Sequence, residues 1–179
     1  SMDQTREEHL TGGTMTGVAR AGDTVRRTAG HWTLRVHQLL AHLREQGITE
    51  VPEPQGFDAQ GREVLSFLPG AAAISLTDDL RAESVLIQAA RLLRRIHDAT
   101  GTIAREWMDG WQSPPQEPVE VICHGDFAPY NCLFSGTSLT GVIDFDNAGP
   151  GPRLWDISYA VYRFAPITAL SNPENFGSI

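Results

Sequence analysis

Residues 121–147 read VICHGDFAPYNCLFSGTSLTGVIDFDN, and this stretch decides how the rest of the chain is interpreted. A short apolar run leads into His-Gly-Asp at residues 124–126, and Asn131 follows the aspartate by five positions. Two further apolar runs flank a Ser-Gly-Thr-Ser turn at residues 135–138, which predicts a β-hairpin. The second run ends in Asp-Phe-Asp at residues 144–146. The pattern predicts a turn that carries a carboxylate and a carboxamide, and a hairpin that returns more carboxylates to the same end.

This set of oxygen-bearing side chains suits phosphoryl transfer. One carboxylate receives the proton of an attacking hydroxyl, while an Asn oxygen and a second carboxylate hold the magnesium that bridges the nucleotide phosphates. The catalytic loop of protein kinases, H-R-D-x-x-x-x-N followed by D-F-G, has the same spacing. Here Gly125 replaces the Arg of that loop, and Asp146 replaces the final Gly.

With its H-G-D turn, the chain resembles the aminoglycoside phosphotransferase / choline kinase family, the small-molecule branch of the kinase-like phosphotransferases. The resemblance runs from residue 12 to residue 164 and is strongest in the C-terminal third. It implies an α+β, protein-kinase-like fold. Residues 1–70 would form a small antiparallel nucleotide-binding lobe with one helix. Residues 71–179 would form a mostly helical catalytic lobe, shortened at its C-terminus because the family continues further.

The resemblance assigns roles to the polar residues of the central stretch. Asp126 is the expected catalytic residue, which orients or deprotonates the acceptor hydroxyl. Asn131 and Asp144 are the expected Mg²⁺ ligands, since this ion prefers oxygen atoms. Asp146 lies two residues beyond Asp144, and strand geometry would put it on the same face, where it could support a second metal ion. His124 is expected to brace the loop.

The nucleotide side departs from the family pattern. A glycine-rich bend at Gly12 and Gly13 would let backbone N–H groups approach the phosphates, although a plain hairpin would look the same. Kinase-like proteins grip the phosphates with a strand Lys that is held by a helix Glu. This sequence contains no lysine, and its 14 basic residues are all Arg. Arg26 best matches the lysine position, with Arg27 on the opposite strand face, and His37 stands at the Glu position.

Residues 63–70 predict a strand that runs into a Pro-Gly break. In the resembled family this break is the hinge between the lobes, and the backbone of Ser66, Phe67 and Leu68 would bind adenine. An ordinary strand end explains the same residues locally.

Apolar spacing predicts three helices, at residues 31–47, 80–100 and 153–164. The expected inner faces of the first two consist of Leu34, Val36, Leu39, Leu40 and Leu43, and of Val85, Leu86, Ala89, Leu92, Leu93 and Ile96. Residues 107–118 predict a loop anchored by its tryptophans, and Gly-Pro-Gly-Pro at residues 149–152 predicts a stiff turn. His97 and Asp156 match family positions that pack beneath the catalytic turn, so both are expected to be structural.

Composition narrows the classes of function. With 179 residues, 41% of them hydrophobic, the chain predicts an ordinary globular protein of one domain or two small lobes. A net charge of −8 without a basic stripe argues against a nucleic-acid partner. No apolar run reaches membrane-helix length and the start lacks a signal-peptide pattern, so we expect a cytoplasmic protein without a membrane partner. Cys123 and Cys132 are expected to be small buried hydrophobes.

The expected activity is therefore transfer of the γ-phosphoryl group of ATP, or of GTP, to a hydroxyl of a small molecule, with Mg²⁺ as cofactor. Residues 101–179 carry three Arg against nine Asp and Glu, a net charge of −6. This charge either favours a cationic acceptor or reflects a solvated surface with metal ligands. The acceptor could be an aminoglycoside, a macrolide or a small metabolite. Two alternatives stay open: a nucleotide-binding pseudokinase or partner-binding module, and a metal-dependent hydrolase built on the Asp cluster.

Overall fold

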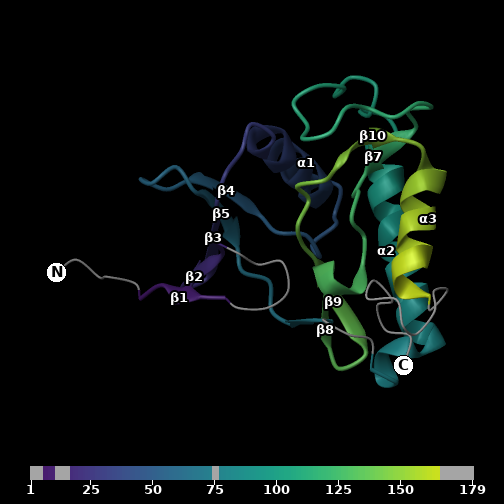
Figure 1. Ribbon diagram of the computed structural model, residues 1–179, viewed down its shortest axis with the longest axis horizontal. Coiled ribbons are helices and arrows are strands. Elements are labelled where there is room, and N and C mark those ends of the chain that lie inside the picture. The colour runs from purple at the N-terminus through teal and green to yellow at the C-terminus, as the bar shows by residue number, and fades with distance from the viewer. Residues whose placement is uncertain (1–5, 11–16, 74–76, 166–179) are drawn as a thin grey trace, which may run out of the picture.

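The N-terminal part of the chain forms one antiparallel sheet with a helix beside it. The computed structural model describes residues 6–10, 17–73 and 77–165. The sheet has the spatial order β1-β2-β3-β5-β4. Its strands are β1 (Glu8–His9), β2 (Ala19–Ala21), β3 (Thr24–Arg27), β4 (Pro54–Phe57) and β5 (Glu63–Ser66). Helix α1 (Thr33–Glu45) packs against β4 (Figure 1).

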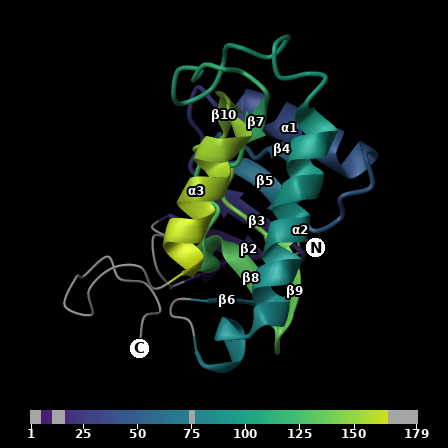
Figure 2. The same ribbon diagram turned by 90° about the vertical axis from the view of Figure 1, so that its right-hand side faces the viewer.

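The C-terminal part combines two long helices with two small sheets. Helices α2 (Glu83–Thr100) and α3 (Arg153–Phe164) lie side by side (Figure 2). One sheet consists of β6 (Ala71–Ala72), β8 (Cys132–Ser135) and β9 (Ser138–Val142), and the other pairs β7 (Val121–Cys123) with β10 (Gly149–Gly151). Two 3-10 turns, η1 (Asp79–Arg81) and η2 (Pro129–Asn131), precede α2 and β8. The architecture is α+β, as the sequence predicts.

The predicted helix faces are mostly confirmed. In α1 the expected inner-face residues Val36, Leu39, Leu40 and Leu43 are buried. In α2 the same holds for Val85, Ala89, Leu92, Leu93 and Ile96. Two positions were wrong: Leu34 is 67% exposed and Leu86 is 50% exposed. A helix advances about 100° per residue, so Leu34 falls on the side opposite Val36, and Leu86 falls at the edge of its stripe.

Two loop predictions had different outcomes. The segment from Trp107 to Pro118 is a loop, and it is anchored by Trp111, which is 5% exposed and donates its ring N–H to the Trp107 carbonyl at 2.6 Å. The predicted stiff turn at residues 149–152 was wrong, because three of its residues form β10. Pro150 is tolerated there because a two-stranded sheet consists of edge strands, where a missing N–H costs little.

The hairpin predicted around residues 135–138 is present as β8 and β9. Cys123 and Cys132 lie in β7 and β8 and are buried and unbridged, as expected. Within residues 6–10, 17–73 and 77–165, no helix is long and apolar enough to cross a membrane.

Candidate active site

The His-Gly-Asp turn follows directly from β7, and its glycine is required by the backbone. Gly125 has φ +85°, a conformation that costs an L residue free energy. A Cβ atom at this position would also collide with the Asn147 carbonyl oxygen. Gly125 thus lets the His-Gly-Asp turn pass close beneath the loop that follows the hairpin.

A buried carboxylate supports this turn from α3. Asp156 is fully buried and accepts hydrogen bonds from the backbone N–H groups of His124 and Gly125, at 2.9 and 3.1 Å. The Nε2 atom of His97, in α2, donates to the same carboxylate at 2.7 Å. Burial alone would raise the pKa of Asp156, but these hydrogen bonds, that of His97 foremost, hold it below its ordinary value. The expected structural roles of His97 and Asp156 are confirmed.

His124 braces the turn against the hairpin. Its Nδ1 atom accepts the Asp126 N–H at 3.1 Å, and its Nε2 atom donates to the Ile143 carbonyl at 3.0 Å. These two bonds specify the neutral tautomer protonated at Nε2. The side chain is also fully buried, against the ring of Phe145 at 4.5 Å between centroids. His124 is therefore a support of the loop rather than a reacting group.

The turn and the hairpin meet at Ile143. Its N–H donates to the Asn131 carbonyl at 2.8 Å, while its own carbonyl accepts the bond from His124. The Asn131 side-chain NH₂ donates to the Asp126 carboxylate Oδ2 at 2.9 Å, so the amide oxygen is left as its ligand atom. These contacts bring Asp126, Asn131 and the start of the Asp-Phe-Asp segment into one site, as the sequence predicts.

Asp144 and Asp146 are brought together differently from the expectation. Strand β9 ends at Val142, so strand periodicity does not orient the two aspartates. Asp144 has φ +58°, and it is the only non-glycine residue with a positive φ in the part of the chain that the structure describes. Such a backbone conformation is costly and tends to occur at functional sites. The turn directs both carboxylates toward one arginine.

That arginine is Arg27, whereas the sequence pointed to Arg26. The Arg27 guanidinium lies 2.8 Å from Asp146 Oδ2, 3.5 Å from Asp144 Oδ1 and 2.7 Å from Glu63 Oε1. Arg26 instead lies 3.8 Å from Asp58, on the other face of β3. Neighbouring strand residues point to opposite faces, so an error of one position reverses the orientation. With no lysine to mark the position, the sequence did not determine which arginine faces the site.

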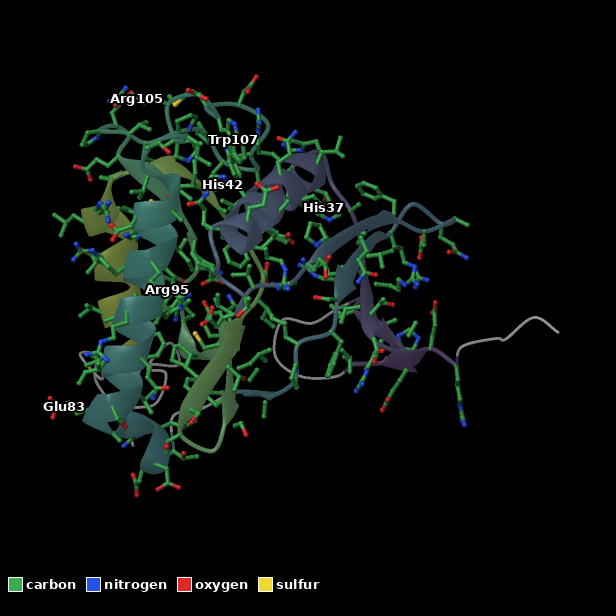
Figure 3. The ribbon with its side chains drawn as sticks, turned by 180° about the vertical axis from the view of Figure 1, so that it is seen from behind. His37, His42, Glu83, Arg95, Arg105 and Trp107 are labelled. Carbon is green, nitrogen blue, oxygen red and sulfur yellow. The ribbon has the colours of Figure 1, made fainter. Side chains whose placement is uncertain are left out.

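A strand glutamate and a helix histidine complete this cluster. Glu63, at the start of β5, is 1% exposed and accepts a hydrogen bond from His37 Nε2 at 2.9 Å. Figure 3 shows His37 on the side of α1 that faces the strands. The acidic partner of the arginine therefore comes from a strand, and the helix contributes the histidine that holds it. Sequence reasoning missed Glu63, although an acidic residue that opens an apolar strand is a usable signal.

The charges of the cluster affect one another. Burial alone would lower the pKa of Arg27, but the carboxylates of Asp146, Glu63 and Asp144 raise it above its ordinary value. The pKa of Asp144 is raised, first by burial and then by repulsion from Asp146, although Arg27 opposes the shift. Asp144 thus retains electrostatic repulsion that a bound cation would relieve.

The donor atoms fit a magnesium ion that takes its remaining ligands from water and phosphate. Asn131, Asp144 and Asp146 offer oxygen atoms, which Mg²⁺ prefers. Among the described residues, no three His, Cys, Asp or Glu side chains form a ready-made metal cage. This donor set suits an ion that arrives together with a nucleotide.

The other expected nucleotide contacts are only partly described. Gly12 and Gly13 lie outside the described residues. Ser66 ends β5, and its N–H donates to the Glu53 carbonyl at 2.9 Å. The Phe67 N–H donates to the backbone carbonyl of Asp23 at 2.8 Å. Adenine recognition at residues 66–68 would therefore use the other backbone groups of this segment, including those of Leu68.

Two tyrosines that sequence reasoning missed contact Asp126. Tyr130 and Tyr159 both direct their hydroxyl groups to its Oδ1 atom. Tyr130 lies four residues after Asp126, within the recognised motif, which is the signal that could have identified it. Tyr159 comes from α3, and nothing in its local sequence links it to the catalytic turn.

An apolar groove of about 720 Å³ lies between α2 and α3. Its lining includes Leu86, Ala89, Ile157, Val161 and Phe164, and none of the acidic residues of the site. The polar cluster, rather than this groove, is the candidate active site.

Comparisons with known proteins agree with this geometry. The phosphotransferase enzyme family matches residues 100–173, which include the catalytic turn, the hairpin and α3. The trifolitoxin immunity protein of Rhizobium leguminosarum bv. trifolii is 37% identical over 147 residues. That match covers 79% of this chain but 55% of the relative, so this chain spans about half of the relative's length.

Solved structures share the fold at low identity. An aminoglycoside-3'-phosphotransferase of type VIII has a TM-score of 0.65 and 22% identity, over 96% of this chain and 81% of its own. The GDP complex of aminoglycoside 2'-phosphotransferase-IIIa has a TM-score of 0.66 and 17% identity, over 88% of this chain and 72% of its own. The expected kinase-like fold is confirmed.

Proposed function

We propose that this chain, whose residues 100–173 match the phosphotransferase enzyme family and whose fold is protein-kinase-like, transfers a phosphoryl group from a nucleotide to a hydroxyl of a small molecule. The observation that carries the proposal is the cluster around Arg27. This arginine comes from the N-terminal sheet and meets Asp144 and Asp146, which the hairpin holds beside Asp126 and Asn131. Arg27, the candidate phosphate-binding residue, and Asp126, the candidate base, thus come from two parts of the chain and face one site.

In this proposal Asp126 orients the acceptor hydroxyl and takes its proton. Arg27 turns N–H donors from Asp144 and Asp146 to the nucleotide phosphates, a role in which arginine binds two oxygens at once. Glu63 holds the arginine in place, and His37 holds Glu63. A magnesium ion held by Asn131, Asp144 and Asp146 would neutralise charge on the phosphates. Residues 1–70 would act as the nucleotide lobe and residues 71–179 as the catalytic lobe.

The donor is proposed to be ATP or GTP, and the reaction is placed in the cytoplasm, where these nucleotides are available. The acceptor is proposed to be an aminoglycoside-like antibiotic or a small metabolite. The acidic charge of residues 101–179 favours a cationic acceptor. Trifolitoxin belongs in the acceptor panel because the 37% identical relative is an immunity protein for it.

The test combines binding with transfer. Thermal melting is measured with ATP and GTP, each with and without Mg²⁺, and γ-labelled nucleotide is then incubated with the acceptor panel. We expect a magnesium-dependent rise in Tm and label transfer to at least one acceptor. Asp126→Asn should keep the rise in Tm and lose transfer, whereas Asp144→Asn should lose both. Asp78→Asn, a change at a fully exposed side chain, is the matched control.

A second candidate is a binding module without transfer activity. The absence of lysine from the phosphate grip favours it. A rise in Tm that does not require Mg²⁺, together with no transfer in any combination, would favour this candidate over the enzyme.

A further inference from the structure

The carboxylate of Asp126 accepts three side-chain hydrogen bonds from the protein. Its Oδ2 atom accepts the side-chain NH₂ of Asn131 at 2.9 Å. Its Oδ1 atom accepts the hydroxyl of Tyr159 at 2.5 Å and also that of Tyr130. The oxygen that is free of Asn131, and therefore suited to receive a proton from a substrate, is covered by two phenols.

The two phenols come from different elements and meet over this one oxygen. Tyr130 belongs to η2, Tyr159 belongs to α3, and their hydroxyl oxygens lie 3.0 Å apart. Each phenol has a single proton, so pairing both protons with the carboxylate leaves no proton for the contact between the two oxygens. Arg163, one turn further along α3, donates its Nε–H to the Tyr159 oxygen at 3.2 Å.

The phenols are set up as hydrogen-bond donors. Burial, followed by the neighbouring Asp126 carboxylate, raises the pKa of both tyrosines above the ordinary range. The Arg163 guanidinium lies over the rings of Tyr130 and Tyr159, at 5.6 and 5.4 Å from their centroids. The arginine holds the rings in place while the hydroxyls stay protonated and directed at Asp126.

We propose that Tyr130 and Tyr159 are positioning residues that cap Oδ1 of Asp126, so that water does not use this oxygen and a bound acceptor must displace a phenol to reach it. This inference rests on the proposed phosphotransferase function and identifies what makes that reaction depend on the acceptor. The cap links base availability to acceptor binding, because only an acceptor held by other contacts can compensate for the hydrogen bond that it displaces.

The cap acts on two competing reactions with the same chemistry. In transfer, the acceptor oxygen bonds to the γ-phosphorus, its proton passes to Asp126, and the bond from that phosphorus to the nucleoside diphosphate breaks. In hydrolysis, a water oxygen takes the place of the acceptor oxygen, and the products are inorganic phosphate and the nucleoside diphosphate. The capped carboxylate should support little hydrolysis.

The experiment measures nucleotide hydrolysis without any acceptor. Wild type, Tyr130→Phe, Tyr159→Phe and the double variant are compared with Mg-ATP and Mg-GTP, and nucleotide affinity is followed by thermal shift. Phenylalanine keeps the ring and removes only the hydroxyl. We expect the double variant to hydrolyse nucleotide at least five-fold faster than wild type, with unchanged affinity, and we expect Asp126→Asn in the double variant to abolish the gain.

Tyr162→Phe is the matched control, since it removes a hydroxyl from the same helix and leaves both capping phenols in place. An unchanged or slower hydrolysis in the double variant, with nucleotide affinity intact, would overturn the cap while the proposed function stands. A gain that persists after Asp126→Asn would overturn it too. If wild type and all variants fail to bind either nucleotide, the proposed function fails and the cap fails with it.

Discussion

Gly125 shows how one residue of the motif is fixed by the backbone rather than by chemistry. The left-handed conformation alone costs about 1–2 kcal/mol for a residue with a side chain. At Gly125 the collision with Asn147 adds to that cost, whereas Gly61, with φ +76°, has open space around it. The two glycines therefore separate the cost of conformation from the cost of the close contact.

We expect Gly61→Ala to lower the free energy of unfolding by about 1–2 kcal/mol. Gly125→Ala should lower it by clearly more, because either the turn or the Asn147 loop must move. Denaturant unfolding of both variants measures the difference. Equal losses would mean that the approach of Asn147 does not constrain the turn.

Asp144 illustrates a residue whose role is unfavourable for stability. Its raised pKa means that the folded state holds the proton more tightly than the unfolded chain does, so its ionisation near neutral pH opposes folding. Its contribution to stability is present below the unfolded pKa and is lost as pH rises through the folded pKa.

Asp144→Asn should therefore melt at the same temperature as wild type or higher at neutral pH without divalent ions. Asp146→Asn should melt lower, because it removes the 2.8 Å contact with Arg27. Scanning calorimetry of the two variants makes the comparison. A marked loss of Tm in Asp144→Asn would contradict the raised pKa.

At the scale of elements, α2 and α3 are joined beneath the His-Gly-Asp turn by His97 and Asp156. The carboxylate serves two backbone N–H groups and one imidazole, so its loss leaves several buried donors without a partner. The lowered pKa of Asp156 gives a stabilising contribution that is present above pH 4, near the unfolded pKa, and is lost as pH falls through the lower folded value.

Asp156→Asn should lower the free energy of unfolding at pH 7 by about 1–3 kcal/mol for each buried donor that the carboxamide leaves without an acceptor. Stability of the variant should also depend less on pH below about pH 4. Chemical denaturation across pH measures both effects. Asp98→Asn, an exposed carboxylate that pairs with Arg94 and Arg153, is the control and should change little.

At the scale of the molecule, Arg27 connects the N-terminal sheet to the Asp-Phe-Asp segment. Its side chain is 19% exposed and contacts three carboxylates from β5 and the Asp-Phe-Asp segment. Removing it would leave Glu63 buried with His37 as its remaining partner.

Arg27→Met should lower the free energy of unfolding by about 3 kcal/mol, the lower end of the range for breaking a buried pair, because the side chain keeps some solvent contact. It should also speed amide exchange in residues 143–147. Arg26→Met is the adjacent control and should cost much less, since the ion pair of Arg26 with Asp58 is long, at 3.8 Å. Similar losses in the two variants would show that Arg27 does not tie the parts together.

The sequence by itself determined the three helices, the hairpin and the spacing of the central motif. The three helices, the hairpin and the proximity of Asp126 to Asn131 follow from local periodicity and from a separation of five residues, which a single turn can bridge. The kinase-like fold could be predicted because the central motif resembles that of the aminoglycoside phosphotransferase / choline kinase family, which implies this fold.

The tertiary structure alone decided which residues face the site across the fold. The sequence pattern pointed to Arg26, with Arg27 on the opposite strand face, and only the packing of β3 against the Asp-Phe-Asp loop showed that Arg27 faces the site. Glu63 and Tyr159 lie 36 and 33 residues from the partners they bind, Arg27 and Asp126, and no local pattern encodes such contacts. Neighbouring residues determine local geometry, whereas these contacts form only when elements distant in the sequence pack together.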